Sequence, residues 1–168
     1  MEIILVLDNI RSTYNVGAIL RTAEGLGVKK VILSGYTPRW NDKNLLPHLR
    51  EKLNREIHKT ALGAEEMLEI SSVDDVDAEL DELKAKAWKI VGLENNIEDE
   101  RLIKINDSKL KEKVGAKIVL VLGEEVAGIR PNLYPKIDCF VEIPMRGQKE
   151  SFNVSVATGI ILAFLTLS

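Results

Sequence analysis

The stretch that decides the fold runs from residue 141 to residue 159 and reads VEIPMRGQKESFNVSVATG. It begins with a strand-like apolar run that ends at Ile143, and a polar loop through Gly147 follows. A helix is expected to begin at Ser151 and to continue to about residue 166, apolar on nearly every side. Such a helix needs cover all round, from its own sheet and from a second subunit. On these residues alone, an ordinary terminal core helix capped by a serine fits equally well.

The composition is that of an ordinary globular protein. With 168 residues, 45% hydrophobic and 29% charged, the chain is expected to form one domain over residues 1–168. The single cysteine, Cys139, excludes an internal disulfide and fits a reducing cytoplasm. We expect no metal site, no signal peptide and no membrane span, since no stretch approaches roughly 20 apolar residues. The net charge of −3 excludes a wholly basic surface but leaves room for a local basic groove.

Apolar runs that alternate with helical patterns predict an α/β fold, with a mostly parallel sheet covered on both faces. The expected strands are residues 3–7, 31–33, 88–93, 117–122 and about 139–143. The expected helices are residues 15–26, 42–53, 74–87 and 151–166. The span 56–70 shows no clear pattern. In a sheet of this kind ligands bind beyond the carboxyl ends of the strands, and four segments at that edge carry unusual residues.

The first segment follows strand 3–7 and reads DNIRSTYNVGAILRTA over residues 8–23. On a helical wheel Arg21 lies far from the apolar stripe, so it projects towards solvent, a ligand or a partner chain. A single exposed arginine is usually only a solubilising charge. Asn9, Asn15 and Gly17 around it indicate a prepared polar surface instead.

The second and third segments follow two further strands. GLENN, residues 92–96, is by itself consistent with a simple turn. LVLGEEVAGI, residues 120–129, has two glycines spaced as in phosphate loops, but no Lys-Ser/Thr pair follows Gly128 and the G-x-G-x-x-G pattern is absent. Glu124 and Glu125 would repel a phosphate. This loop therefore suits a ligand that carries positive charge.

The fourth segment is the loop after Ile143. It offers the Ser151 hydroxyl and the Asn153 amide, the latter expected in the first turn of the last helix.

Three motifs occur in order along the chain: NxGxxxRTA at residues 15–23, LGEExxG at 122–128 and IPMxGxxxSFNVSVA at 143–157. Together they resemble the three signature motifs of the SpoU/TrmH branch of SPOUT RNA methyltransferases, and TALGA at residues 60–64 is similar to a stretch common between the first two. The resemblance covers essentially the whole chain. It departs from the family pattern at Glu124, where asparagine is usual, and at Val126, where glycine is common.

The resemblance implies a Rossmann-like sheet whose C-terminal part, about residues 88–168, is threaded into a deep trefoil knot. S-adenosylmethionine would be held bent in the knot. An antiparallel homodimer would place first-motif residues of one chain against the cofactor of the other. The implied reaction transfers the sulfonium methyl group to a ribose 2′-hydroxyl of tRNA or rRNA.

The resemblance also implies roles for individual residues. Arg21 would act on the 2′-hydroxyl, and because a guanidinium is normally always protonated, stabilising the developing alkoxide is the favoured role over that of a base. Asn15 and Asn153 would orient Arg21 and the ribose. Glu125 would hold the second-motif loop near the cationic cofactor, and Ser151 would position substrate or cap the last helix. The expected cofactor contacts are Leu93, Gly123, Gly128, Ile143 and Phe152.

Two other functions remain as alternatives. One is a knotted RNA-binding or assembly protein without turnover, and the other is an NAD oxidoreductase, which the missing glycine pattern disfavours. Because the motifs span nearly the whole chain, we expect no added RNA-binding extension and recognition of RNA by the core dimer. The residues expected to contact RNA, which an ordinary surface helix would also explain, are Arg39, Lys43, Arg50, Lys52, Arg55 and Lys59.

Overall fold

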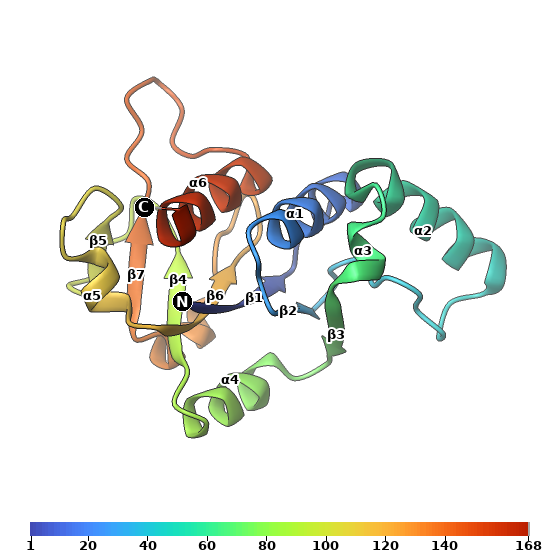
Figure 1. Ribbon diagram of the computed structural model, residues 1–168, viewed down its shortest axis with the longest axis horizontal. Helices are drawn as coiled ribbons and strands as arrows, with labels where there is room; N and C mark the ends of the chain where they lie inside the picture. Colours follow the sequence, from blue (N-terminus) through green and yellow to red (C-terminus); the bar gives the residue numbers. More distant parts are fainter. Residues whose placement is uncertain (168) are drawn as a thin grey trace.

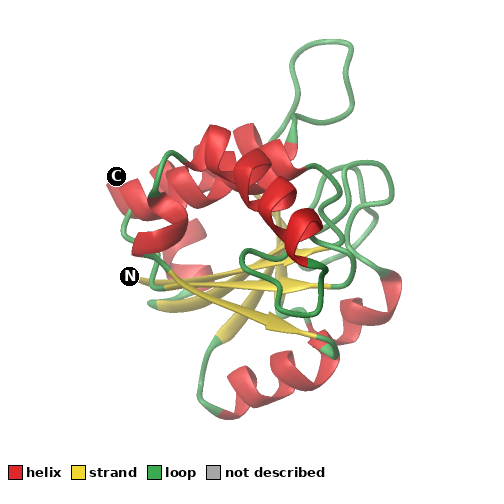
Figure 2. Ribbon diagram, turned by 90° about the vertical axis from the view of Figure 1, so that its right-hand side faces the viewer, coloured by secondary structure: helices red, strands yellow, loops and turns green. Residues whose placement is uncertain are grey.

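A computed structural model describes residues 1–167 as one seven-stranded sheet with helices on both faces (Figure 1 and Figure 2). The strand order is β3-β2-β1-β6-β4-β7-β5, and every strand pair is parallel. The strands are β1 (Glu2–Asp8), β2 (Lys30–Ser34), β3 (Glu69–Val73), β4 (Lys89–Leu93), β5 (Leu102–Lys104), β6 (Lys117–Leu122) and β7 (Cys139–Glu142). The expected α/β fold with a mostly parallel sheet is confirmed.

Helices cover the two faces of this sheet unequally. They are α1 (Thr13–Gly25), α2 (Pro47–Ala61), α3 (Ala64–Met67), α4 (Val76–Ala85), α5 (Leu110–Val114), the 3₁₀ turn η1 (Pro131–Lys136) and α6 (Val154–Leu167). On β1, Leu5 and Leu7 belong to the core under α1, α2, α5 and α6, whereas Ile4 and Val6 face α4 and η1. Successive side chains of a strand point to opposite faces of the sheet, and both faces are covered by helices. Apolar residues are therefore needed at every position, which explains the unbroken apolar runs.

The register aligns the carboxyl ends of four neighbouring strands. Leu122 at the end of β6 pairs with Leu7 of β1 on one side and with Leu93 of β4 on the other. Leu93 in turn pairs with Val141 of β7. The loops that follow these strands therefore begin side by side at one edge of the sheet. The strand order and register establish the parallel sheet, while the knot stays a prediction.

The expected helices have different bounds in the structure. The helix expected at 42–53 corresponds to α2, which begins only at Pro47, whose fixed φ suits the first helical position, and ends at Ala61. The unclear span 56–70 holds the end of α2, all of α3 and the start of β3. The helix expected at 74–87 is shorter, since the Asp75 side chain accepts a hydrogen bond from the Ala78 N–H at 3.1 Å and caps α4.

The last helix does not begin at Ser151. The Asn153 carbonyl accepts the N–H of Ala157 at 2.9 Å, and the Asn153 side chain accepts the N–H of Ser155 at 2.9 Å. Asn153 is thus the N-cap of α6, and it lies before the first turn rather than in it. Ser151 is exposed in the loop between β7 and α6, which projects from the body of the molecule in Figure 1.

Helices α1 and α2 pack closely at Gly17. A Cβ atom at this position would overlap both the Thr60 hydroxyl and the carbonyl oxygen of Ile57. The Thr60 hydroxyl also donates a 2.9 Å hydrogen bond to the carbonyl of Tyr14. The glycine of the first motif therefore allows the helix that carries Asn15 to lie against α2.

We expect Gly17→Ala to lower the free energy of unfolding by about 1–3 kcal/mol, because the added methyl group would force the two helices apart. Gly25 ends the same helix and has nothing within 4 Å of an added Cβ, so Gly25→Ala is the matched control. Urea unfolding measures both. Equal stability of the two variants would show that the close approach of α1 and α2 is not needed.

Candidate functional site

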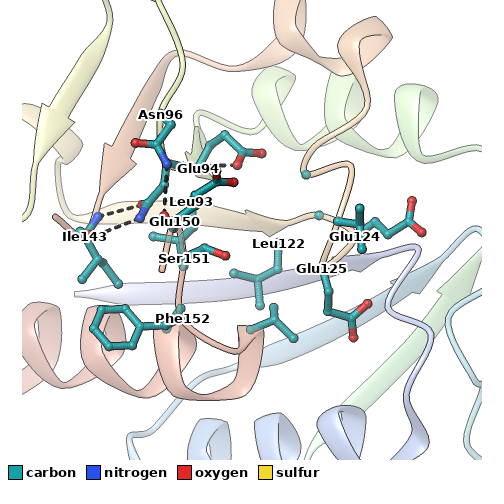
Figure 3. Close-up of a pocket in the computed structure, with 16 residues that line it drawn as sticks. Leu93, Glu94, Asn96, Leu122, Glu124, Glu125, Ile143, Glu150, Ser151 and Phe152 are labelled. Carbon is teal, nitrogen blue, oxygen red and sulfur yellow. Dashed lines mark hydrogen bonds between the residues drawn. The ribbon is translucent and has the colours of Figure 1, made fainter. Parts of the chain in front are cut away.

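A cavity of about 210 Å³ lies at the carboxyl ends of β4, β6 and β7 (Figure 3). It opens where the second, third and fourth segments of the sequence converge. The residues that line it include all five expected cofactor contacts: Leu93, Gly123, Gly128, Ile143 and Phe152. Glu125 and Ser151 also line it, whereas Asn15, Arg21 and Asn153 do not.

The cavity combines an apolar wall with an acidic rim. Leu93, Leu122, Ile143 and Phe152 supply apolar surface from different segments (Figure 3). None of its described lining residues is a lysine or an arginine. Its carboxylates would repel a phosphate, so the site suits a ligand with a flat apolar part and a positive charge. The acidic lining residues are Glu94, Glu124, Glu125 and Glu150.

The loop after β4 joins the other two loops. The Asn95 side chain donates to the carbonyl of Ile143 at 2.9 Å and accepts the Ile143 N–H at 3.0 Å (Figure 3). The Asn96 amide donates to the carbonyl of Glu150 at 3.0 Å. The segment 92–96, which by itself was consistent with a simple turn, is instead the connector that fixes the loop after β7.

Glu94 fixes the loop after β6 in a similar way. One carboxylate oxygen accepts the N–H of Ile129 at 2.7 Å and the other accepts the N–H of Asn95 at 3.1 Å. Burial raises the pKa of Glu94, and these two N–H donors oppose the rise. A Cβ at Gly128 would overlap the Glu94 carboxylate, and the φ of Gly128 is +70°, so glycine suits this position on both counts.

The second-motif loop is shaped by its own backbone. Glu124 and Gly128 exchange backbone hydrogen bonds of 3.0 and 2.9 Å, and a Cβ at Gly123 would overlap the backbone of Gly128. Glu125, which was expected to hold this loop, joins it to α1: its carboxylate accepts the Asn15 amide N–H at 2.9 Å. Glu94 and the Glu124–Gly128 pairing also hold the loop.

The three motifs meet in a small polar cluster beside the cavity. Asn15 donates to Glu125, and its own carbonyl oxygen accepts the Asn153 amide at 3.2 Å. One chain thus joins the first, second and third motifs through Asn15, Glu125 and Asn153. Ser151 lies at the rim of the adjoining cavity.

Arg21 stands apart from this cluster. It lies on α1 six residues beyond Asn15, which places it roughly 9 Å further along the helix axis. Its side chain is exposed and forms no hydrogen bond or ion pair within residues 1–167. A single chain does not bring Arg21 to the cavity, so its expected role stays a prediction.

Sequence reasoning missed an ion pair between a buried aspartate and a partly exposed arginine that holds the first segment in place. Asp8 is 1% exposed and accepts two hydrogen bonds from the Arg130 guanidinium, at 2.7 and 2.9 Å, and one from Ser34 at 2.7 Å. The carboxylate raises the pKa of Arg130. The pair joins the ends of β1 and β2 to the loop after β6. The only signal in the sequence is an aspartate directly after an apolar strand.

The sequence model of the SpoU rRNA Methylase family matches residues 2–163. The chain belongs to this family. A curated relative from Coxiella burnetii, the 23S rRNA (guanosine-2′-O-)-methyltransferase RlmB, is 35% identical over 95% of the chain. The match covers 56% of that relative, so the chain spans little more than half the length of the curated proteins it matches.

Solved structures share the fold. The TrmH/SpoU tRNA modifying enzyme of Aquifex aeolicus superposes with a TM-score of 0.77 at 26% identity, over 99% of this chain and 74% of that one. The SpoU methyltransferase AviRb of Streptomyces viridochromogenes, solved in complex with AdoMet, gives 0.78 at 20% identity, over 99% and 57%. At 20% identity, the AviRb likeness shows the fold alone.

Within residues 1–167, no helix is long and apolar enough to cross a membrane. No group of three or more His, Cys, Asp or Glu side chains in this range is arranged to hold a metal ion.

The raised pKa of Glu94 leads to a prediction about pH. As pH falls from neutral towards 4.5, the folded protein should take up a proton at Glu94 before the unfolded chain does. Wild type should therefore gain stability relative to Glu94→Gln over this range, as measured by urea unfolding at several pH values. Glu98→Gln, at an exposed glutamate in the same loop, is the control and should not reproduce the trend. A wild-type advantage that shrinks on acidification would contradict the prediction.

Proposed function

We propose that this chain transfers the methyl group of S-adenosylmethionine to a ribose 2′-hydroxyl in tRNA or rRNA. The observation that carries the proposal is the convergence of the second and third motifs on one cavity with an apolar wall and an acidic rim, with the first motif joined to both beside it through Asn15. Relatives named as 23S rRNA 2′-O-methyltransferases and a tRNA-modifying neighbour support the reaction class. An RNA substrate of this kind supports a cytoplasmic site of action.

The residues present fit this cofactor. Leu93, Ile143 and Phe152 offer apolar surface for the adenine, and the loop 123–128 offers backbone groups. Glu125 supplies negative charge for the sulfonium. The bound cofactor would supply an electrophilic methyl group, a chemistry that the side chains of the cavity cannot provide.

The chain itself has to position and activate the hydroxyl. A ribose 2′-hydroxyl is a weak nucleophile at neutral pH. Asn15 and Asn153, held together through their amides, would orient the ribose, and Ser151 at the rim would position it. The ribose oxygen would form a bond to the methyl carbon as the sulfur–carbon bond breaks, and the hydroxyl proton would pass to water. Arg21 would stabilise the negative charge that develops on the oxygen.

We infer that Arg21 reaches this site from a second copy of the chain. Helix α6 carries no charged residue, and its Val156 and Leu167 are 49% and 75% exposed. Arg21 lies on α1 directly before Thr22, which an added Cβ at Gly159 of α6 would contact. A partner that covers α6 would therefore also lie close to Arg21. This supports a homodimer with composite sites.

The same dimer would bind RNA through α2. Arg39 is paired with Asp74 at 2.6 Å and is less available than expected. The other cations of this stretch form no ion pair within the described chain and would contact phosphates. They are Lys43, Arg50, Lys52, Arg55 and Lys59.

Calorimetry should show S-adenosylhomocysteine binding with about one molecule per chain. Phe152→Glu should abolish binding, because it places a charge on the apolar wall, and Glu79→Gln on α4 is a control far from the cavity. No binding at millimolar ligand would overturn the proposal. Binding without methyl transfer to RNA, in assays with labelled cofactor and bulk tRNA or rRNA, would favour the non-catalytic alternative.

Arg21→Ala should lower the rate of methyl transfer by about 100-fold to 1,000-fold, the range for losing one stabiliser of a developing oxyanion. Cofactor affinity should stay unchanged, because Arg21 lies outside the cavity of its own chain.

Mixing Arg21→Ala with Phe152→Glu tests whether sites are shared between chains. Activity should return to about a quarter of wild type, since half of the dimers are mixed and each of those holds one intact site. Sedimentation and tagged pull-down have to confirm that chains exchange. No recovery after exchange would exclude a shared site.

A further inference from the structure

An exposed cluster of Arg11, Tyr36 and Glu124 lies at the carboxyl ends of β1, β2 and β6. The Arg11 guanidinium contacts Glu124 at 3.4 Å and lies over the Tyr36 ring, 6.0 Å from its centre. Burial and a hydrogen bond to Glu124 raise the pKa of the Tyr36 hydroxyl. Glu124 also lines the cavity, so this cluster adjoins the methyl-transfer site.

The backbone around the cluster is held in place. The Asn9 side chain accepts the Tyr36 N–H at 3.2 Å, and the Ile10 N–H donates to the Thr37 hydroxyl at 3.0 Å. Glu124 is fixed by its two backbone hydrogen bonds with Gly128. The backbone that carries the ring and the carboxylate is therefore fixed, which reduces the entropy that a ligand must overcome on binding.

The same groups are open to a ligand. The Arg11 side chain is 78% exposed and its contact with Glu124 is long, so this ion pair contributes little and is readily displaced. Tyr36 is 49% exposed, and 23% of the Glu124 side-chain surface is exposed to solvent.

Glu124 and Glu125 are adjacent in the loop after β6, but their side chains contact different groups. Glu125 contacts Asn15 in the polar cluster, whereas Glu124 contacts Arg11, and Figure 3 shows the two side chains pointing in different directions. A nucleoside joins its ribose to its base through one bond. If the ribose lies against Asn15 and Asn153, the base lies within reach of the neighbouring cluster.

We propose that Arg11, Tyr36 and Glu124 are the residues that bind and select the nucleobase of the methylated nucleotide, and that this base is guanine, the base that the names of the curated relatives give. The inference rests on the proposed function and deepens it by naming the residues that select the base. Single-stranded bases are recognised by stacking on tyrosine or arginine planes together with hydrogen bonds to the Watson–Crick edge. Arg11 and Tyr36 supply planar groups for stacking, and Glu124 supplies a hydrogen-bond acceptor for the edge of the base.

The carboxylate selects guanine among the four bases. An ionised glutamate only accepts hydrogen bonds, through two adjacent oxygens. Guanine presents two adjacent donors on its Watson–Crick edge, the N1–H and the N2 amino group. Adenine and cytosine place an unprotonated ring nitrogen beside their amino group, and uracil places its single donor between two carbonyl oxygens, so each would oppose the carboxylate with a lone pair.

Binding of short fluorescent oligouridines with one central guanosine, inosine or adenosine tests the inference, in the presence of S-adenosylhomocysteine. Wild type should bind the guanosine probe about tenfold more tightly than the adenosine probe, with inosine between them because it keeps N1–H and lacks the amino group. Glu124→Gln should abolish this ranking, since its amide replaces one acceptor by a donor. Tyr36→Leu should weaken all three probes by about tenfold, and Tyr36→Phe, which keeps the ring, should not.

Glu79→Gln on α4 is the matched control and should keep the guanosine preference. Equal binding of the three probes by wild type, or an unchanged ranking in Glu124→Gln, would overturn the inference. Cofactor binding and methyl transfer to bulk RNA are measured in parallel. If both occur without a guanosine preference, only the base assignment fails. If the preference is present without transfer, the base site stands and the proposed catalysis fails.

Discussion

The hydrogen bonds of Glu94 and Asn95 are the interactions on which the site depends. A parallel sheet brings the ends of β4, β6 and β7 to one edge, but it does not determine the path of the loops that follow. Glu94 fixes the loop after β6 through the N–H of Ile129, and Asn95 fixes the loop after β7 through Ile143. The side chains of these two consecutive residues therefore hold the loops after three neighbouring strands so that the loops line one cavity.

This arrangement has an electrostatic cost that the proposed ligand would relieve. Four glutamates line the cavity, and burial already raises the pKa of Glu94. Like charges in one cavity repel one another and disfavour the folded state. A cationic ligand binds the folded chain and not the unfolded one, so it offsets this repulsion and stabilises the protein as it binds. The same acidity would keep phosphate groups out of the cavity, which agrees with the proposal that the cations of α2 contact them.

The sequence predicts five of the seven strands because their signals are local, whereas β3 and β5, which have no fully buried residue, were not predicted. The apolar runs of β1 and β6 mark buried strands without any knowledge of their neighbours. The predicted start of the last helix, at Ser151, was wrong because Ser151 and Asn153 are both good N-cap residues. Only the path of the backbone selects Asn153. The family resemblance named the cavity residues. It did not name the clamp at Glu94 or the Asp8–Arg130 pair, whose partners lie 35 and 122 residues apart and meet only in the tertiary structure.

In a single chain, two neighbouring helices each carry a feature that lacks a contact. Helix α6 has apolar residues that solvent still reaches, and the adjacent α1 carries Arg21 without a partner among residues 1–167. Apolar surface favours a covering partner, while an arginine that stabilises an oxyanion is effective only where water is excluded. A second copy laid on α6 would meet both requirements with one interface. Association and catalysis would then depend on each other, since the contact that buries α6 also places Arg21 beside its target.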